Sequence, residues 1–202
     1  MSTIKKSAGR PKGTGTGKAR ELTPTEILRL TEIADIRDRA LTWLCLGAGL
    51  RISEACSMTV GRLANDGSVL VEKSRSKSSR SRRCYVMPQA LVFIRAYLAT
   101  RPSAGADEPL FPSHTTGGFM TANYGVKLAD KLFEKAGIVG ATSHSLRRTF
   151  ANNARRKLVD VVTIKEQLGH KWLNTTAEYL SVADTERAIT IGSTEFALHP
   201  SL

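Results

Sequence analysis

The strongest constraint on the fold is the segment of residues 36–48. From residue 40 it is almost entirely apolar, and this run, ALTWLCLGAGL, continues to Leu50. Apolar side chains fill nearly every position there, so a helix would bury its whole circumference rather than one stripe. We therefore predict a central, buried helix over about 36–48. Gly47 and Gly49 are expected to break this helix just before Leu50 and Arg51.

The rest of the chain predicts a mainly α fold with a small antiparallel β-sheet. SVLVE (68–72) and CYVM (84–87) have strand-like compositions and are separated by a long charged loop. Thr23 or Thr25 can cap a first helix, and Pro88 can open a helix that runs to about residue 99. Further helices are expected near residues 121–136, 144–156, 161–168, 174–181 and 184–191.

The charge balance points to a polyanionic partner. The chain has 30 Lys and Arg against 18 Asp and Glu, a formal net charge of +12, which favours nucleic acid over other partners. No apolar run reaches the roughly 18 residues of a membrane span, so no membrane association is expected. Cys45, Cys56 and Cys84 lie in apolar or strand-like segments at spacings that fit no zinc site, so reduced core thiols and no metal are predicted.

Residues 1–20 form a separate zone, which we predict to be a disordered basic tail, with one globular domain over 21–202. The zone contains six cations and no acid, which is half of the net charge. Its AGRPKG resembles the Gly-Arg-Pro core of an AT-hook, although an arm that binds phosphates without sequence preference is the alternative. The DNA contacts expected from the tail are Arg10, Lys12, Lys18 and Arg20.

The segment SHSLRRTF, residues 143–150, gathers three basic side chains within five positions. If the segment is helical, His144 and Arg147 are i,i+3 neighbours on a polar face, while Leu146 and Phe150 can pack into a core. The segment lacks a carboxylate, and an imidazole beside a guanidinium suits a phosphate. For this motif alone, a solvated basic face remains the alternative.

Three further segments carry candidate residues. Arg51 in GLRISE follows the apolar helix, where a charge needs a partner, either Glu54 in an internal salt bridge or an anion. Lys77 in KSRSKSSRSRR is either a functional residue or one cation of a solvated loop. LGHKWLNTTAEYL contains His170 and also Tyr179, which is either a nucleophile or a core aromatic residue.

Together these side chains match the needs of phosphodiester cleavage without a metal ion. A tyrosine phenol can attack phosphorus in line once it loses its proton, and neighbouring cations help because its reference pKa is about 10. Paired arginines can stabilise the charge on the nonbridging oxygens. A lysine can protonate the leaving 5′ oxygen, and imidazoles can hydrogen bond to the phosphate.

The order and spacing of these segments resemble the tyrosine recombinases, the lambda-integrase family of site-specific recombinases. GLRISE is similar to the family's first arginine motif, HSLRRTFA to its HxLRHTFA motif, and LGHKWLNTTAEYL to its LGHxxxxTTxxYxH motif. KSSRSR, residues 77–82, is similar to the KxxKxR of the family's β-hairpin. The resemblance covers about residues 22–190, with Arg148 at a position where a second histidine is common.

The resemblance implies a tyrosine recombinase catalytic-domain fold and a DNA breaking-rejoining enzyme with a 3′-phosphotyrosine intermediate. In the family, an N-terminal helical domain usually precedes the catalytic domain, so this chain resembles the short members such as the fimbrial phase-switch invertases. The implied catalytic residues, with no cofactor and no metal, are Arg51, Lys77, His144, Arg147, His170 and Tyr179. Beyond the tail, DNA contacts are expected from Arg75, Arg80, Arg82 and Arg148.

The implied partners are double-stranded DNA and further copies of the chain, as a tetramer on paired DNA sites. The apolar residues after Tyr179 would provide the contact between copies, as the corresponding helix does in the family. The expected location is the cytoplasm, for a protein that is either associated with the bacterial nucleoid or encoded by a plasmid or phage. Two alternatives stay open: a catalytically silent DNA-binding regulator, and a type IB topoisomerase, which shares the chemistry but rejoins the same strand.

Overall fold

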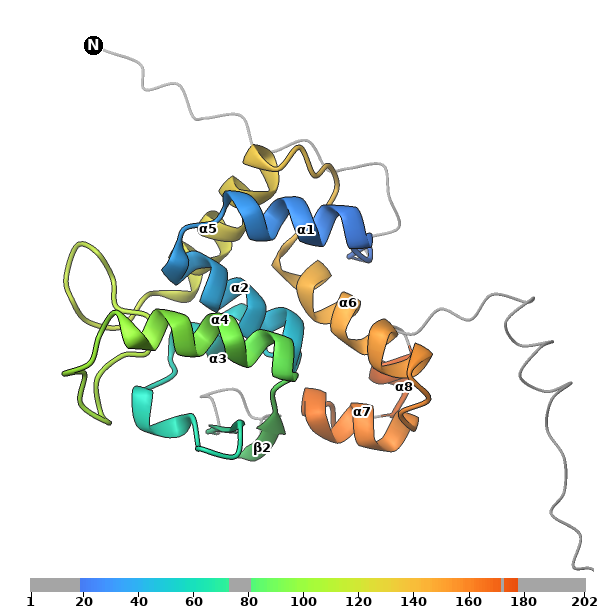
Figure 1. Cartoon of the computed structure of the whole chain (residues 1–202). Coiled ribbons are helices and arrows are strands. Elements are labelled where there is room, and N and C mark those ends of the chain that lie inside the picture. The colour runs from blue at the N-terminus through green and yellow to red at the C-terminus, as the bar shows by residue number, and fades with distance from the viewer. Residues whose placement is uncertain (1–18, 73–80, 172, 178–202) are drawn as a thin grey trace, which may run out of the picture.

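The computed structural model of the chain describes residues 19–72, 81–171 and 173–177, and within them a mainly helical domain with a two-stranded antiparallel sheet. The predicted fold class is confirmed (Figure 1). The helices are α1 (Pro24–Ile33), α2 (Ile36–Ala48), α3 (Ile52–Cys56), α4 (Pro88–Ala99), α5 (Ala122–Lys135), α6 (Ser143–Arg156), α7 (Val161–Leu168) and α8 (Leu173–Ala177). The strands are β1 (Ser68–Val71) and β2 (Arg82–Tyr85), and a 3-10 turn spans Val60–Arg62.

Helix α2 is the centre of the core, as its sequence predicts, and it packs against α4 and α6. Gly49 ends the helix at φ 67° and donates its N–H to the carbonyl of Cys45. Gly47, however, lies inside α2, and the expectation that it breaks the helix is wrong. A Cβ at Gly47 would stand 2.3 Å from that of Ala90, so this glycine allows α2 and α4 to approach each other closely.

The two strands form the predicted antiparallel pair, with Ser68 opposite Tyr85 and Val71 opposite Arg82. The second strand begins and ends two residues earlier than its sequence predicts. The chain leaves the ladder after Tyr85 because the Met87 N–H donates to the carbonyl of Gly47 in α2 at 2.8 Å. Helix α3, which is only five residues long, was not predicted and begins directly after Arg51.

The chain is anchored to the domain from Arg20 onwards. The guanidinium of Arg20 pairs with both carboxylate oxygens of Glu26, and its Nε donates to the carbonyl of Val139 in the loop before α6. The N–H of Leu22 donates to Thr149 Oγ1 on α6 at 2.9 Å. Residues 1–18, which hold the rest of the predicted tail, lie outside the described residues.

The three cysteines are buried and free, in agreement with the prediction. The described ranges contain no group of three or more His, Cys, Asp or Glu side chains that could hold a metal ion. None of the helices described in the structure is long and apolar enough to cross a membrane.

Candidate active site

Arg147 is fixed inside the domain by the ends of two other helices. Its side chain is almost fully buried, and its two terminal nitrogens donate to the carbonyls of Gly49, 2.6 Å away, and Leu168, 2.5 Å away. Gly49 caps the C-terminus of α2, and Leu168 is the last residue of α7. Carbonyls at a helix C-terminus lack helical partners and carry partial negative charge, so they compensate a buried cation. These two hydrogen bonds therefore fix the position of the Arg147 guanidinium.

The carboxylate of Glu54 links three arginines. It accepts hydrogen bonds from Arg51 at 2.9 Å and from both terminal nitrogens of Arg82 at 3.0 Å, and it lies 3.9 Å from Arg147. Burial alone would raise the pKa of this carboxyl, but the hydrogen bonds and charges of Arg82 and Arg51 outweigh it and lower that pKa below its ordinary value. Sequence reasoning offered Glu54 only as a partner of Arg51 and missed this shared role.

A small pocket of about 150 Å³ lies next to this cluster; its lining residues, which define the arginine pocket, are Arg51, Ile52, Ser53, Ser143, His144 and Arg147. The side chain of Arg51 is 39 % exposed, so its salt bridge to Glu54 leaves part of the guanidinium open to a ligand. Ser143 and His144 form the first turn of α6, where free N–H groups and the helix dipole favour an anion. Three guanidinium groups around one carboxylate leave an excess of positive charge.

Both histidines of the predicted site are held in the neutral form at pH 7. Partial burial, and then the charges of Arg147 and Arg51, lower the pKa of His144 below its ordinary value. Burial lowers the pKa of His170 to about 3, and the charges of Arg147, Arg51 and Arg82 act in the same direction. A phosphate anion in the arginine pocket would oppose these charges and make each imidazole a better proton acceptor.

His170 is positioned by the turn that ends α7. Gly169 adopts the left-handed conformation at φ 67°, and the following N–H, that of His170, bonds to the carbonyl of Lys165. The His170 ring is buried, and its Nδ1 lies 3.0 Å from the hydroxyl of Thr176 on α8. The ring is thus held between α7 and the helix that leads towards Tyr179.

The structure brings together Arg51, His144 and Arg147 around one pocket, with His170 on the adjoining turn. Lys77 and Tyr179 lie outside the described residues, as do five of the predicted DNA contacts, which are Arg10, Lys12, Lys18, Arg75 and Arg80. Arg148 is partly exposed on α6.

Two arginines expected to contact DNA make hydrogen bonds within the domain. Arg20 pairs with Glu26 and the Val139 carbonyl. Arg82 is nearly buried, and all three of its nitrogens bond to Glu54 or to the carbonyl of Gln167. The bonds of Arg82 could not be predicted from the sequence, because its partners are 28 and 85 residues away.

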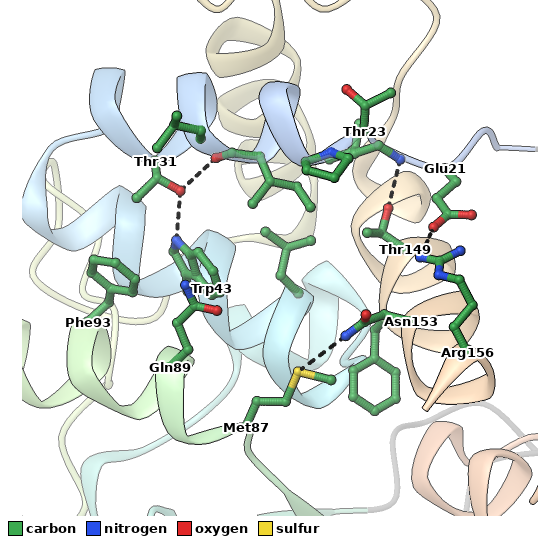
Figure 2. Close-up of a pocket in the computed structure, with 16 residues that line it drawn as sticks. Glu21, Thr23, Thr31, Trp43, Met87, Gln89, Phe93, Thr149, Asn153 and Arg156 are labelled. Atoms are coloured by element: carbon green, nitrogen blue, oxygen red, sulfur yellow. Dashed lines mark hydrogen bonds and ion pairs between the residues drawn. The ribbon is translucent and has the colours of Figure 1, made fainter. Parts of the chain in front are cut away.

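A second and larger hollow, of about 820 Å³, lies on another side of α6, between that helix and α1, α2 and α4 (Figure 2). We call it the apolar groove; among its lining residues are Leu28, Trp43, Met87, Phe93, Phe150 and Asn153. Most polar groups along it bond to one another, as Trp43 does to Thr31 at 3.0 Å. The groove therefore offers apolar contact rather than charge.

The sequence of residues 20–186 matches the phage integrase family. The chain belongs to this family. Of the residues in the motifs described above, Arg51, His144 and Arg147 line one pocket, and His170 lies on the adjoining turn.

Phage integrase family members similar to this chain include the Xer recombinases. Tyrosine recombinase XerA of Pyrococcus horikoshii is 29 % identical over 164 residues, which cover 81 % of this chain and 57 % of XerA. Tyrosine recombinase XerD of Corynebacterium glutamicum is 34 % identical over 164 residues, 79 % of this chain and 53 % of XerD. The chain thus spans just over half the length of these curated relatives.

Solved structures show the same fold. The crystal structure of XerA recombinase superposes with a TM-score of 0.75 at 26 % identity, over 93 % of this chain and 68 % of that one. The Tn1549 transposon integrase in complex with transposon right end DNA superposes with a TM-score of 0.69 at 20 % identity, over 85 % and 64 % of the two chains.

Proposed function

We propose that this phage integrase family member is a site-specific DNA recombinase that cuts and rejoins strands through a 3′-phosphotyrosine intermediate. The observation that carries the proposal is the arginine pocket, in which Arg51, His144 and Arg147 surround a space of about 150 Å³ with an excess of positive charge. Such a pocket suits one phosphate group of a DNA backbone.

In the proposed chemistry, Arg51 and Arg147 hold the nonbridging oxygens of the scissile phosphate. His144 lies in the same pocket and can donate a hydrogen bond to the phosphate. If the Thr176 hydroxyl donates to Nδ1 of His170, the ring hydrogen is on Nε2, where it can serve as a further donor.

The step balances with side chains alone. The oxygen of Tyr179 forms a bond to phosphorus while the bond from phosphorus to the 5′ oxygen breaks, and Lys77 donates a proton to that oxygen. The phenol proton passes to His144, whose lowered pKa leaves it neutral and able to accept it at pH 7. Rejoining reverses these steps with a 5′ hydroxyl of the new partner strand, so the proposal requires neither a metal ion nor ATP.

The test is to trap the covalent intermediate. The full chain is incubated with a nicked duplex from its native flanking DNA, from which the cut fragment diffuses away, and the adduct is located by mass spectrometry. We expect the adduct on Tyr179 and none with Tyr179→Phe, whereas an adduct on Tyr85, Tyr97 or Tyr124 would overturn the proposal. Adducts without exchanged junctions on paired sites would indicate topoisomerase-like relaxation, and no adduct would indicate a silent DNA-binding protein.

We further propose that four copies assemble on two DNA sites through the C-terminal residues. Recombination needs four strand cuts, and the segment after Tyr179 carries Ile189, Ile191, Phe196 and Leu198. The apolar groove supports this proposal, because it provides a large apolar surface away from the arginine pocket. Each copy would place its C-terminal apolar side chains in the groove of the next, which closes a ring.

A further inference from the structure

Besides its backbone ladder with β1, strand β2 is joined to helices α2, α3 and α7 by the side chains of Arg82 and Gln167. The strand begins at Arg82, five residues after Lys77 in the sequence. The strand lies against α7, so the bonds that join β2 to α7 fix the position of Arg82, the first residue of the strand.

Arg82 makes bonds to two other elements at once. Its terminal nitrogens each donate to one oxygen of Glu54 in α3 at 3.0 Å, and its Nε donates to the carbonyl of Gln167 in α7 at 3.0 Å. A Cβ added to Gly169 would stand 2.8 Å from the Arg82 guanidinium, so the turn before His170 is packed directly on this group. The planar fork of arginine is suited to such a three-way bond, which the ammonium of a lysine cannot reproduce.

Gln167 makes the complementary attachment with its amide. Its Nε2 donates to the carbonyls of Tyr85 and Ala48, both at 2.9 Å, and its Oε1 accepts from the N–H of Tyr85 at 3.1 Å. The side chain therefore pairs with β2 as a neighbouring strand residue would, and it also holds the C-terminal end of α2. Only an amide can both donate and accept in this way.

We propose that Arg82 and Gln167 are positioning residues, which hold β2, and with it the entry of the general acid Lys77, in register with the phosphate-binding side chains. This inference rests on the proposed function, and it gives Arg82 a role inside the protein in place of a DNA contact. Glu54, shared by Arg51 and Arg82, connects the two halves of the site: one arginine faces the pocket and the other holds the strand.

The test separates protonation of the leaving group from the other steps. A substrate with sulfur in place of the bridging 5′ oxygen needs no proton on its leaving group, so it should restore cleavage by Lys77→Ala. Gln167→Leu should cut ordinary DNA about 10- to 100-fold more slowly than the wild type, because the acid is misplaced, and should recover most of this loss on the sulfur substrate. Arg82→Lys should behave in the same way, and Gln167→Glu, which turns an acceptor oxygen towards the carbonyls of Tyr85 and Ala48, should show a defect at least as large.

Arg83→Met is the matched control. Arg83 is the next residue on the same strand, but its side chain is 59 % exposed, and it lies 3.6 Å from Asp66 and donates a long hydrogen bond, 3.3 Å, to Ser68 Oγ. This variant should cut both substrates at the wild-type rates.

Each other outcome overturns a distinct statement. If Lys77→Ala recovers on the sulfur substrate but Gln167→Leu and Arg82→Lys do not, the two residues only stabilise the fold and the inference fails. If Arg82→Lys instead lowers DNA affinity without changing the sulfur effect, Arg82 contacts DNA. If Lys77→Ala itself does not recover, the assigned general acid, and so that part of the proposed function, is wrong.

Discussion

The two hollows that flank α6 differ in a way that size alone does not reveal. The arginine pocket is about 150 Å³ and lies beside a cluster of three guanidinium groups around the single carboxylate of Glu54. The apolar groove is about 820 Å³, and its polar groups bond to one another, as Leu22 does to Thr149 and Glu21 to Arg156. Uncompensated charge, rather than volume, marks the place where an anion is expected to react.

One helix serves both hollows because its two faces carry different residues. His144 and Arg147 lie on the face towards α3 and α7, whereas Thr149, Asn153 and Arg156 line the groove. If the two faces have separate functions, substitutions on one should leave the function of the other intact.

The largest effect is expected from Arg147→Lys. Lysine keeps the charge, but it cannot bond to the carbonyls of Gly49 and Leu168 and also reach the phosphate. We expect cleavage of the nicked duplex at saturating DNA to fall by about 10²–10³-fold. The same substitution at Arg156, on the groove face of α6, should leave cleavage near the wild-type rate. Similar losses in both variants would mean that the faces are not separate.

Leu28→Glu is expected to lower the rate of recombination by about a hundredfold or more and to leave the rate of cleavage unchanged. Leu28 lines the groove and is 58 % exposed, so the monomer can accommodate a carboxylate at this position. In the assembly, that carboxylate would be buried against apolar side chains of the neighbouring copy at each of four contacts, which is unfavourable. Val92→Glu, on an equally exposed side chain outside the groove lining, is the control. Truncation after Asp184 should reproduce the Leu28→Glu defect. Normal recombination by Leu28→Glu or by the truncated chain would show that the groove does not take part in the assembly.

Much of this arrangement could be predicted from the sequence where the determining contacts are local. The buried helix α2, the cap at Thr23 and the motif around His144 and Arg147 depend on residues within a few positions of one another. The burial of Arg82 could not be predicted, because in the sequence it is one of several adjacent cations. Only the fold places Glu54 and Gln167 beside it.

The groove was not predicted for a similar reason. Its lining residues come from four helices and from the chain before α1, between Glu21 and Arg156, and Leu22 and Thr149, which are hydrogen bonded there, are 127 residues apart. No single segment carries a signal for such a surface. The apolar residues after Tyr179 gave the only sequence indication that a partner surface was needed.

A moderate effect on DNA affinity is expected when residues 2–18 are deleted. Arg20 should be kept, because it is bonded to Glu26 and Val139, and residues 21–23 line the groove. The deleted part has five cations, and if three or four reach phosphates the log–log salt slope of DNA binding should fall by about 3. Cleavage at saturating DNA should be unchanged. Replacing the five cations with glutamine should have the same effect as deletion, and an unchanged slope would show that the tail does not contact DNA.

The smallest expected effect is on the free energy of unfolding. It comes from His170, which lies on the turn next to the arginine pocket. Its pKa is about 3 in the folded protein and about 6.5 when unfolded, so between these values the unfolded chain binds the extra proton. Stability should therefore fall as the pH drops below about 6.5, by up to about 1.4 kcal/mol per pH unit from this group. In denaturant unfolding at pH 6.5 and 5.0, His170→Gln should lose up to about 2 kcal/mol less than the wild type. His114→Gln, in an exposed loop, should follow the wild type. If His170→Gln also follows it, burial and the positive charge around Arg147 do not keep this imidazole neutral, and the contrast between the two sides of α6 is weaker than the geometry indicates.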